Sequence, residues 1–252
     1  YYEVTGEGPD FLMLHANPCD HRMWMYQIAF FSRRFRVIAT DMRGYGRTDK
    51  PAEPYVFEAL AEDALAVCEQ ERITSGIIAG ASMGSKIGFK MVIDRPDLFQ
   101  AMIHVGGNAH RGSSYDGRAA GYLGADVPSY RAGHLAELFA PGFSGTPRGK
   151  FHSNIILDDS AALSGKAIST LFHSFDGVDL VSQVPGIKIP VQIVNGIHDN
   201  SFEGGKKTAS LIEGARHDVI DNAGHLCCLE DPARFQDICV SFLGENGLYP
   251  GI

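Results

Sequence analysis

One serine in the chain has the surroundings of a catalytic nucleophile. Ser82 is the central residue of Gly80–Gly84, which has the pattern Gly-x-Ser-x-Gly. The apolar run Gly76–Ala79 before it predicts a buried strand, and Ser85–Met91 after it predicts a helix. A sharp strand-to-helix turn exposes a serine hydroxyl at the positive end of the helix dipole, where developing negative charge is stabilised. We expect Ser82 to be a nucleophile; the alternative is a Gly/Ser turn that only packs a helix onto a strand.

A serine hydroxyl needs a base beside it, and ten histidines compete for that role. His225 is favoured because its loop, Asp221–Leu226, lies between the last predicted strand and the C-terminal helix. This position brings it to the edge of the sheet at which Ser82 is expected, where ligands bind in open α/β sheets. The other histidines considered have simpler explanations, namely a strand core (His104), a helix start (His21), and a pocket wall or a solvent-facing position in an irregular stretch (His110, His134, His152 and His173).

The base in turn needs an acid that orients its ring. Asp199 follows the predicted strand Val191–Asn195 and therefore lies at the same edge of the sheet. Asp221 is a rival because it precedes His225 by four residues, but a loop residue so close in sequence rarely reaches the far nitrogen of the ring. We expect Asp199 to be the acid. The order serine, acid, histidine along the chain is the order of one particular fold.

A mostly parallel sheet with helices on its faces would position these residues. Short β-branched runs alternate with helical patterns, which is typical of such sheets. The predicted strands are Tyr1–Thr5, Phe11–His15, Phe35–Thr40, Gly76–Ala79, Ala101–Val105, Val191–Asn195 and Asp218–Ile220. The predicted helices are His21–Ser32, Val56–Glu71, Ser85–Ile93, Gly204–Ile212 and Asp231–Phe242.

One long stretch interrupts the alternation. Residues 108–175 are rich in Gly, Ser, His and aromatic residues and contain no clear strand. Because the stretch is too long for an ordinary connection, we expect an inserted helical cap or lid. The predicted organisation is a core of residues 1–107 and 176–252 with a cap at 108–175.

Composition excludes some partners. With 30 acidic and 22 basic residues, the 252-residue chain has a net charge of −8, which argues against nucleic acid or an anionic membrane as its partner. No apolar run is long enough to span a membrane. The five cysteines are irregularly spaced, with no CxxC or HExxH pattern, so we expect reduced thiols in a cytoplasmic protein and neither a metal nor a cofactor. The expected partner is a small-molecule substrate, and a homodimer stays open.

Five segments, taken in order, resemble the α/β-hydrolase superfamily in its serine-nucleophile branch. Leu14–Pro18 resembles the His-Gly oxyanion loop after the third strand of that family, and Asp41–Asp49 resembles its Asp-x-Arg-Gly-x-Gly-x-Ser-Asp turn. Gly80–Gly84, Gly196–Asp199 and Asn222–His225 match its nucleophile, acid and histidine segments. The resemblance covers nearly the whole chain.

The resemblance implies an α/β-hydrolase fold with a small helical cap inserted after the sixth strand, and it implies Ser82, Asp199 and His225 as the triad. It also implies an oxyanion hole made by the backbone N–H groups of Met83 and Asn17. Two departures are Ala16 in place of glycine, which weakens the assignment of Asn17, and Thr48 in place of serine. Because Tyr1–Thr5 resembles the family's second strand, we expect the first strand to lie upstream of it and the sheet edge at Tyr1–Thr5 to be unpaired.

The resemblance further points to hydrolysis of a small carboxylic ester or lactone through an acyl-enzyme. The pattern is similar to that of esterases and lactonases, and aromatic residues of the stretch 108–175 suggest a small, partly apolar substrate. The alternatives are a C–C bond hydrolase of a meta-cleavage or β-diketone type ring-cleavage product and a hydrolase-like ligand receptor without turnover. Candidate substrate contacts are Trp24, otherwise a core residue of the first helix, and Tyr122, otherwise cap packing.

Overall fold

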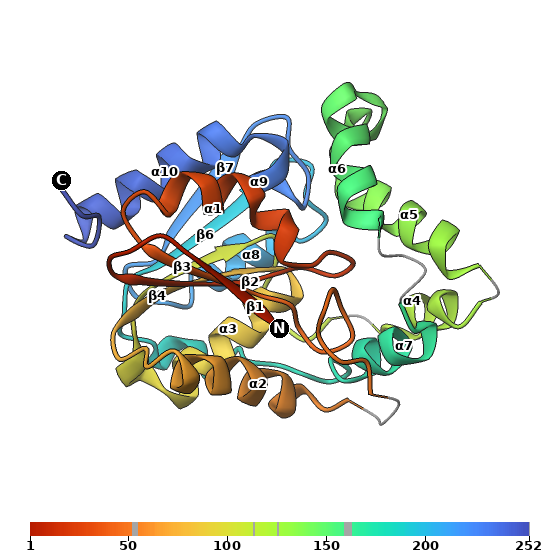
Figure 1. The fold of residues 1–252 in the computed structure, drawn as a ribbon. Helices are drawn as coiled ribbons and strands as arrows, with labels where there is room; N and C mark the ends of the chain where they lie inside the picture. The colour runs from red at the N-terminus through yellow and green to blue at the C-terminus, as the bar shows by residue number, and fades with distance from the viewer. Residues whose placement is uncertain (52–54, 113, 125, 159–162, 252) are drawn as a thin grey trace.

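The computed structural model describes residues 1–51, 55–112, 114–124, 126–158 and 163–251, through which one seven-stranded sheet runs (Figure 1). The strand order is β1-β3-β2-β4-β5-β6-β7, with β1 at an edge. Only the β1–β3 pair is antiparallel among these strands. The strands are β1 (Tyr2–Thr5), β2 (Asp10–Leu14), β3 (Arg36–Thr40), β4 (Gly76–Ala81), β5 (Phe99–Val105), β6 (Val191–Gly196) and β7 (Arg216–Ile220).

Both faces of the sheet are buried against helices, as parallel strands require. Side chains alternate along β2, so that Phe11 and Met13 belong to one hydrophobic cluster while Leu12 and Leu14 belong to the other. The first cluster includes side chains of α1 (Met25–Phe31), α9 (Cys227–Glu230) and α10 (Pro232–Glu245). The second includes side chains of α2 (Phe57–Gln70), α3 (Met83–Asp94) and α8 (Phe202–Ala209). Figure 1 shows α1 and α10 on one side of the sheet and α2 and α3 on the other.

Among the described residues between β5 and β6 are four α-helices, to the right of the sheet in Figure 1. These inserted helices are α4 (Asp116–Tyr122), α5 (Val127–Leu138), α6 (Pro147–Leu157) and α7 (Gly165–His173). They contribute side chains to both hydrophobic clusters, among them Ile168 of α7 and Leu135 of α5. Counted along this chain, the insertion follows the fifth strand; it follows the sixth only if β1 is counted as the second strand. The exact division into core and cap stays a prediction.

The expected α/β-hydrolase architecture is confirmed, with small changes at element ends. The predicted helix His21–Ser32 is a 3-10 helix, η1 (His21–Trp24), followed by α1, because the Asp20 side chain accepts the Arg22 N–H and starts a tight turn. The predicted helix Gly204–Ile212 begins and ends earlier, as α8. None of the helices in the described ranges has the length and hydropathy of a membrane-crossing segment.

Candidate active site

Ser82 occupies the turn between β4 and α3 in a strained backbone conformation. Its φ of 52° and ψ of −109° lie in a region that side-chain-bearing residues rarely adopt. The flanking glycines make the turn possible, because a Cβ added at Gly80 would collide with the Gly84 carbonyl, and one added at Gly84 would collide with the Leu14 carbonyl. The backbone N–H of Ser82 donates to the Val105 carbonyl at 2.7 Å, which ties the turn to β5. The Gly-x-Ser-x-Gly pattern therefore fixes the serine at the N-terminus of a 12-residue helix.

Asp199 and His225 form a buried hydrogen-bonded pair beyond the carboxyl ends of β6 and β7. Nδ1 of His225 lies 2.7 Å from Oδ1 of Asp199, and the two residues are 8% and 6% exposed. With Nδ1 held by the carboxylate, Nε2 is the ring nitrogen left to take a proton. His225 also lines the cavity that Ser82 lines. The structure thus brings the three sequence-predicted residues to one edge of the sheet.

The Asp199 carboxylate is held by several donors. Besides His225, its Oδ1 accepts from the backbone N–H and the hydroxyl of Ser201, each at 2.8 Å, and its Oδ2 accepts from Nδ2 of Asn195 at 2.7 Å. Burial opposes ionisation, but the interaction with the His225 ring and these hydrogen bonds outweigh it and hold the pKa of Asp199 well below its usual range. The carboxylate is therefore ionised and oriented toward the imidazole. The rival Asp221 is exposed.

The loop that carries His225 is tied to the end of α5. The backbone N–H of His225 donates to the Leu138 carbonyl at 2.8 Å. Glu230, which is buried, accepts the N–H groups of Gly224 at 2.7 Å and Ala140 at 2.8 Å with its two carboxylate oxygens. Burial raises the pKa of Glu230 to about 6, although both hydrogen bonds oppose that rise. The position of the candidate base thus depends on the inserted helices as well as on the sheet.

The loop after β2 brings Asn17 to the cavity. Asn17 is 5% exposed, and both of its amide atoms are buried with no hydrogen-bond partner among the described residues. His15 holds the start of this loop, because its Nε2 accepts the Met42 N–H at 2.9 Å and its Nδ1 donates to the Ala16 carbonyl at 2.9 Å. From α5, the fully buried Arg131 donates to the Pro18 carbonyl through Nε at 2.9 Å and Nη2 at 2.7 Å. The predicted oxyanion residues Asn17 and Met83 both line the cavity with Ser82.

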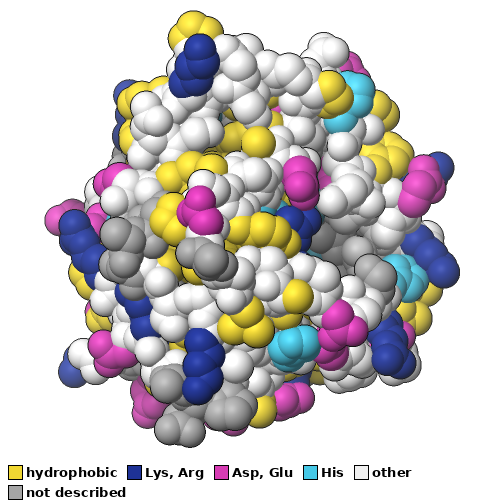
Figure 2. Space-filling model, turned by 90° about the vertical axis from the view of Figure 1, so that its right-hand side faces the viewer, with side chains coloured by type: hydrophobic (Ala, Val, Ile, Leu, Met, Phe, Trp, Pro, Cys, Tyr) yellow, Lys and Arg dark blue, Asp and Glu magenta, His cyan; other side chains and the backbone are white. Residues whose placement is uncertain are grey.

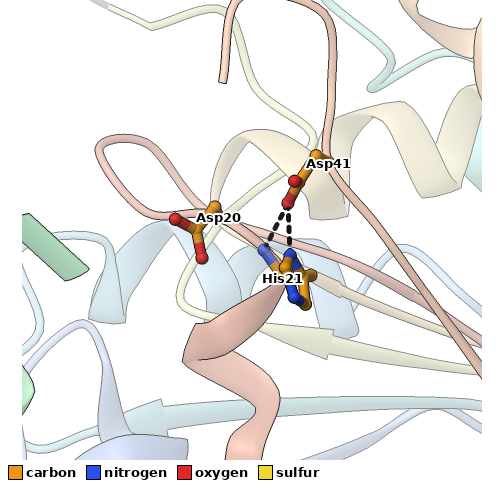
Figure 3. A group of neighbouring side chains, drawn as sticks. All are labelled: Asp20, His21 and Asp41. Atoms are coloured by element: carbon orange, nitrogen blue, oxygen red, sulfur yellow. Dashed lines mark hydrogen bonds and ion pairs between the residues drawn. The ribbon is translucent and has the colours of Figure 1, made fainter. Parts of the chain in front are cut away.

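Asp20, His21 and Asp41 come together behind this loop (Figure 3). Asp41 Oδ1 accepts the backbone N–H of His21 at 2.8 Å and faces its Nδ1 at 2.7 Å, while Oδ2 accepts the Arg47 N–H at 2.9 Å. Both carboxylate oxygens of Asp20 accept from the Arg22 guanidinium. Because the chain's own donors occupy these oxygens, we interpret the group as a connection between η1 and the turn after β3, and not as a metal centre.

A cavity of about 800 Å³ opens between the sheet edge and the inserted helices. Ser82, Met83, Asn17 and His225 contribute to its wall, and Asp199 lies behind His225. The apolar part of the wall comes from Leu138, Phe172 and Phe175, and the polar part includes Lys86, Arg111, Arg118, His134, Glu203 and Lys207. The cavity therefore has room for a small molecule beside the candidate triad.

The two predicted substrate contacts, Trp24 and Tyr122, do not reach the surface of this cavity. Trp24 is 0% exposed and packs near Phe235, with ring centroids 6.5 Å apart. Tyr122 is also 0% exposed, and its hydroxyl lies 2.9 Å from Nδ1 of His134, which does line the cavity. The structure thus places Trp24 in the core and Tyr122 behind His134, and neither lines the cavity.

The wall of the cavity also contains Lys and Arg side chains that were not predicted there from the sequence. Lys86 follows Ser82 by four residues on α3, which places it one helical turn along the same face. This spacing is the one signal that could have identified it. Nothing in the sequence marks Arg111 or Lys207, because the fold alone brings the loop after β5 and α8 to the same wall.

Comparison with known proteins agrees with this geometry. The sequence profile described as the alpha/beta hydrolase fold matches residues 9–232. The chain is 26% identical to 3-oxoadipate enol-lactonase 2 of Acinetobacter baylyi over 218 residues, which are 84% of this chain and 80% of that protein. It is 37% identical to the AB hydrolase superfamily protein YisY of Bacillus subtilis over 91 residues, but these cover only 36% of this chain and 34% of that protein.

The fold comparison gives the same result. The crystal structure of the enol-lactonase from Burkholderia xenovorans LB400 matches with a TM-score of 0.90 at 26% identity, covering 97% of this chain and 96% of that one. Profile, sequence and structure agree over nearly the whole chain. The chain therefore belongs to the alpha/beta hydrolase fold family.

Proposed function

We propose that this hydrolase-family protein cleaves a small carboxylic ester or lactone with Ser82 as nucleophile, through an acyl-enzyme. The observation that carries the proposal is the buried pair of Asp199 and His225 at the cavity that the strained Ser82 lines. Two enol-lactonases among the similar proteins support a lactone or ester as substrate. The cavity has a volume of about 800 Å³ and a wall of both apolar and polar residues, which suits a small molecule.

In the acylation step, each group of the site acts as charge develops on the reacting atoms. His225 Nε2 takes the proton of the Ser82 hydroxyl as the oxygen attacks the carbonyl carbon, and Asp199 stabilises the imidazolium that forms. The oxyanion is bound by the backbone N–H groups of Met83 and Asn17, and each such donor is worth about 3 kcal/mol. When the tetrahedral intermediate collapses, the bond to the leaving oxygen breaks and His225 returns the proton to that oxygen. For a lactone, the alcohol stays attached to the acyl group.

Deacylation repeats the same steps with water. His225 removes a proton from water, the resulting hydroxide attacks the acyl carbonyl, and the Ser82 oxygen leaves and is protonated again by His225. The free acid is released and the enzyme is regenerated. No cofactor takes part in either half of the proposed reaction.

Labelling and turnover together test the proposal. A fluorophosphonate probe should attach to Ser82 in peptide mapping, and Ser82→Ala should lose both labelling and hydrolysis of p-nitrophenyl acetate. Ser210→Ala, a change at an exposed serine of the α8 C-terminus, is the matched control and should keep both. An unlabelled Ser82 in a folded, inactive wild type would refute the proposal.

Two alternatives give different results in the same screen. A wild type that hydrolyses a C–C ring-cleavage product but neither esters nor lactones would be a C–C hydrolase. A wild type that binds a small molecule without any turnover would be a receptor.

We also propose a cytoplasmic location for the protein. All five cysteines are free and buried, which is typical of a reducing compartment.

A further inference from the structure

Lys86 is a buried cation in the wall of the active-site cavity. It is 6% exposed, and its Nζ donates to the carbonyls of His110 at 2.8 Å and Val178 at 3.4 Å. An ammonium has three N–H donors, so these two neutral acceptors leave one donor unused. In the described ranges no carboxylate forms an ion pair with Lys86. Burial lowers the pKa of Lys86 to about 8, and the attraction of the Asp179 carboxylate opposes this shift only in part.

Further cations face the same cavity from other elements. Arg111 comes from the loop after β5, Arg118 from α4 and Lys207 from α8, whereas Glu203 is the one carboxylate among the described lining residues. Arg118 is partly neutralised, because its Nη2 donates to Glu137 Oε2 at 2.9 Å. Arg111 and Lys207 form no ion pair within the described part of the chain. Figure 2 shows dark blue Lys or Arg atoms beside a hollow near the middle of the face that carries the inserted helices.

The position of Lys86 relative to Ser82 limits where a ligand's charge can lie. Four residues along a helix rise about 6 Å, and helical side chains lean back toward the N-terminus, where Ser82 lies. A negative group bound by Lys86 would therefore lie only a few bonds from a carbonyl at Ser82. The apolar side chains of Leu138, Phe172 and Phe175 would cover the carbon chain between them.

We infer that the substrate is an ester or lactone that carries a carboxylate, bound by Lys86 with help from Arg111 and Lys207. A single buried ammonium matches a single negative charge, and a charge-assisted hydrogen bond to it is stronger than a neutral one. A wall dominated by cations also raises the local concentration of anionic substrates. This inference rests on the proposed function, since it names the substrate class of that same site.

A matched pair of esters tests the inference. Mono-p-nitrophenyl glutarate and p-nitrophenyl pentanoate have acyl chains of equal length and differ only in a terminal carboxylate or methyl group. We expect the wild type to have a kcat/KM at least about tenfold higher for the glutarate ester. A hydrogen bond to a charged group contributes about 1.5 kcal/mol or more, which corresponds to a factor of about ten. Lys86→Met should lower the ratio of the two kcat/KM values by about tenfold or more, and Lys86→Arg should retain most of it.

Exposed cavity residues give a second test that does not depend on a buried substitution. Lys207→Gln should raise KM for the glutarate ester severalfold without a matching change for the pentanoate ester. Lys206→Gln, its exposed neighbour outside the cavity lining, is the control and should leave the ratio unchanged. A wild type that prefers the pentanoate ester, or a folded Lys86→Met variant with an unchanged ratio, would overturn the inference.

Binding separates failure of the inference from failure of the proposed function. Glutarate binding to the Ser82→Ala variant is measured by calorimetry, with and without Lys86→Met, and needs no turnover. If the wild type hydrolyses neither ester but glutarate binds in a manner that depends on Lys86, the proposed function fails and the anion site stands. If both esters are hydrolysed without preference and glutarate does not bind, the proposed function stands and the anion site is refuted.

Discussion

Nδ1 of His225 lies 2.7 Å from Oδ1 of Asp199, across 26 positions of sequence. The two residues follow β6 and β7, which are paired in parallel as far as Gly196 and Ile220. The register of two neighbouring strands therefore decides where the acid meets the base. The hydrogen bond places the imidazole proton on Nδ1 and leaves Nε2 free to accept the proton of a nucleophile.

Asp199→Asn should reduce kcat by about 10³-fold or more, because an amide in place of the carboxylate no longer stabilises the imidazolium and favours the wrong tautomer. Asp221→Asn is the matched control, since Asp221 is exposed and precedes His225 by only four residues. Both variants are compared by initial rates on the same ester. A larger loss in Asp221→Asn than in Asp199→Asn would show that the acid is wrongly assigned.

The sequence allows these three residues to be predicted because each is tied to a strand end. Strands are recognised from short β-branched runs, and the residues just after them must meet at one edge of a parallel sheet. Ser82 is further marked by the glycines two residues before and after it, at which an added Cβ would collide with backbone carbonyls. The same reasoning predicts the fold, because period-2 burial on both faces of β2 follows from its apolar residues.

The wall of the cavity could not be predicted in the same way. Lys86 resembles an ordinary lysine of a helix in the sequence. Only the structure shows that it is buried, donates to the carbonyls of His110 and Val178, and lines the cavity. The aromatic residues give the opposite error. Their residue type predicts that Trp24 and Tyr122 line the pocket, but both pack in the interior. Side-chain direction in the inserted helices depends on tertiary packing, which residue type and spacing do not specify.

Gly84→Ala should destabilise the protein by about 1–3 kcal/mol, because the added methyl group meets backbone carbonyls that cannot move aside. The nearest is that of Leu14, and the His15 carbonyl lies 2.7 Å from the position of the new Cβ. Gly133→Ala is the control. Gly133 lies on the exposed side of α5, and a Cβ added there would have no atom of another part of the protein within 4 Å. The substitution should stabilise the protein by about 0.5–1 kcal/mol, because alanine has a higher helix propensity than glycine. Urea denaturation measures both, and equal stability of Gly84→Ala and wild type would contradict the packing of the turn.

Asn17→Ala should separate stability from activity. Both amide atoms of Asn17 are buried without a partner in the described residues, so the truncation removes no hydrogen bond from the free protein. We expect the free energy of unfolding to stay the same or to increase. The backbone N–H is kept, but truncation of the side chain should loosen the loop that positions it beside Ser82 and lower kcat/KM by about threefold to tenfold. Asn154→Ala, a substitution at an exposed position of α6, is the control and should change neither the stability nor kcat/KM. A marked loss of stability in Asn17→Ala would contradict the expectation that its side chain makes no hydrogen bond in the free protein.

Glu230 should make the stability of the protein depend on pH in a way that its glutamine variant does not. Burial raises the pKa of Glu230 from 4.5 to about 6, so the folded protein binds this proton more tightly than the unfolded chain. The resulting stabilisation is fully present below pH 4.5 and is lost as the pH rises through about 6, a change of about 2 kcal/mol.

Glu230→Gln cannot titrate, and its amide nitrogen cannot accept the backbone N–H of Ala140 or Gly224, so it loses one hydrogen bond at every pH. The free energy of unfolding of the wild type minus that of Glu230→Gln should therefore fall by about 2 kcal/mol between pH 4 and pH 7. Urea denaturation across this range measures the difference, in which the other titrating groups cancel. Glu69→Gln, at an exposed position of α2, is the matched control for replacing a carboxylate by an amide. If the curves of Glu230→Gln and wild type run parallel, the Glu230 carboxyl is not the group that titrates in this window.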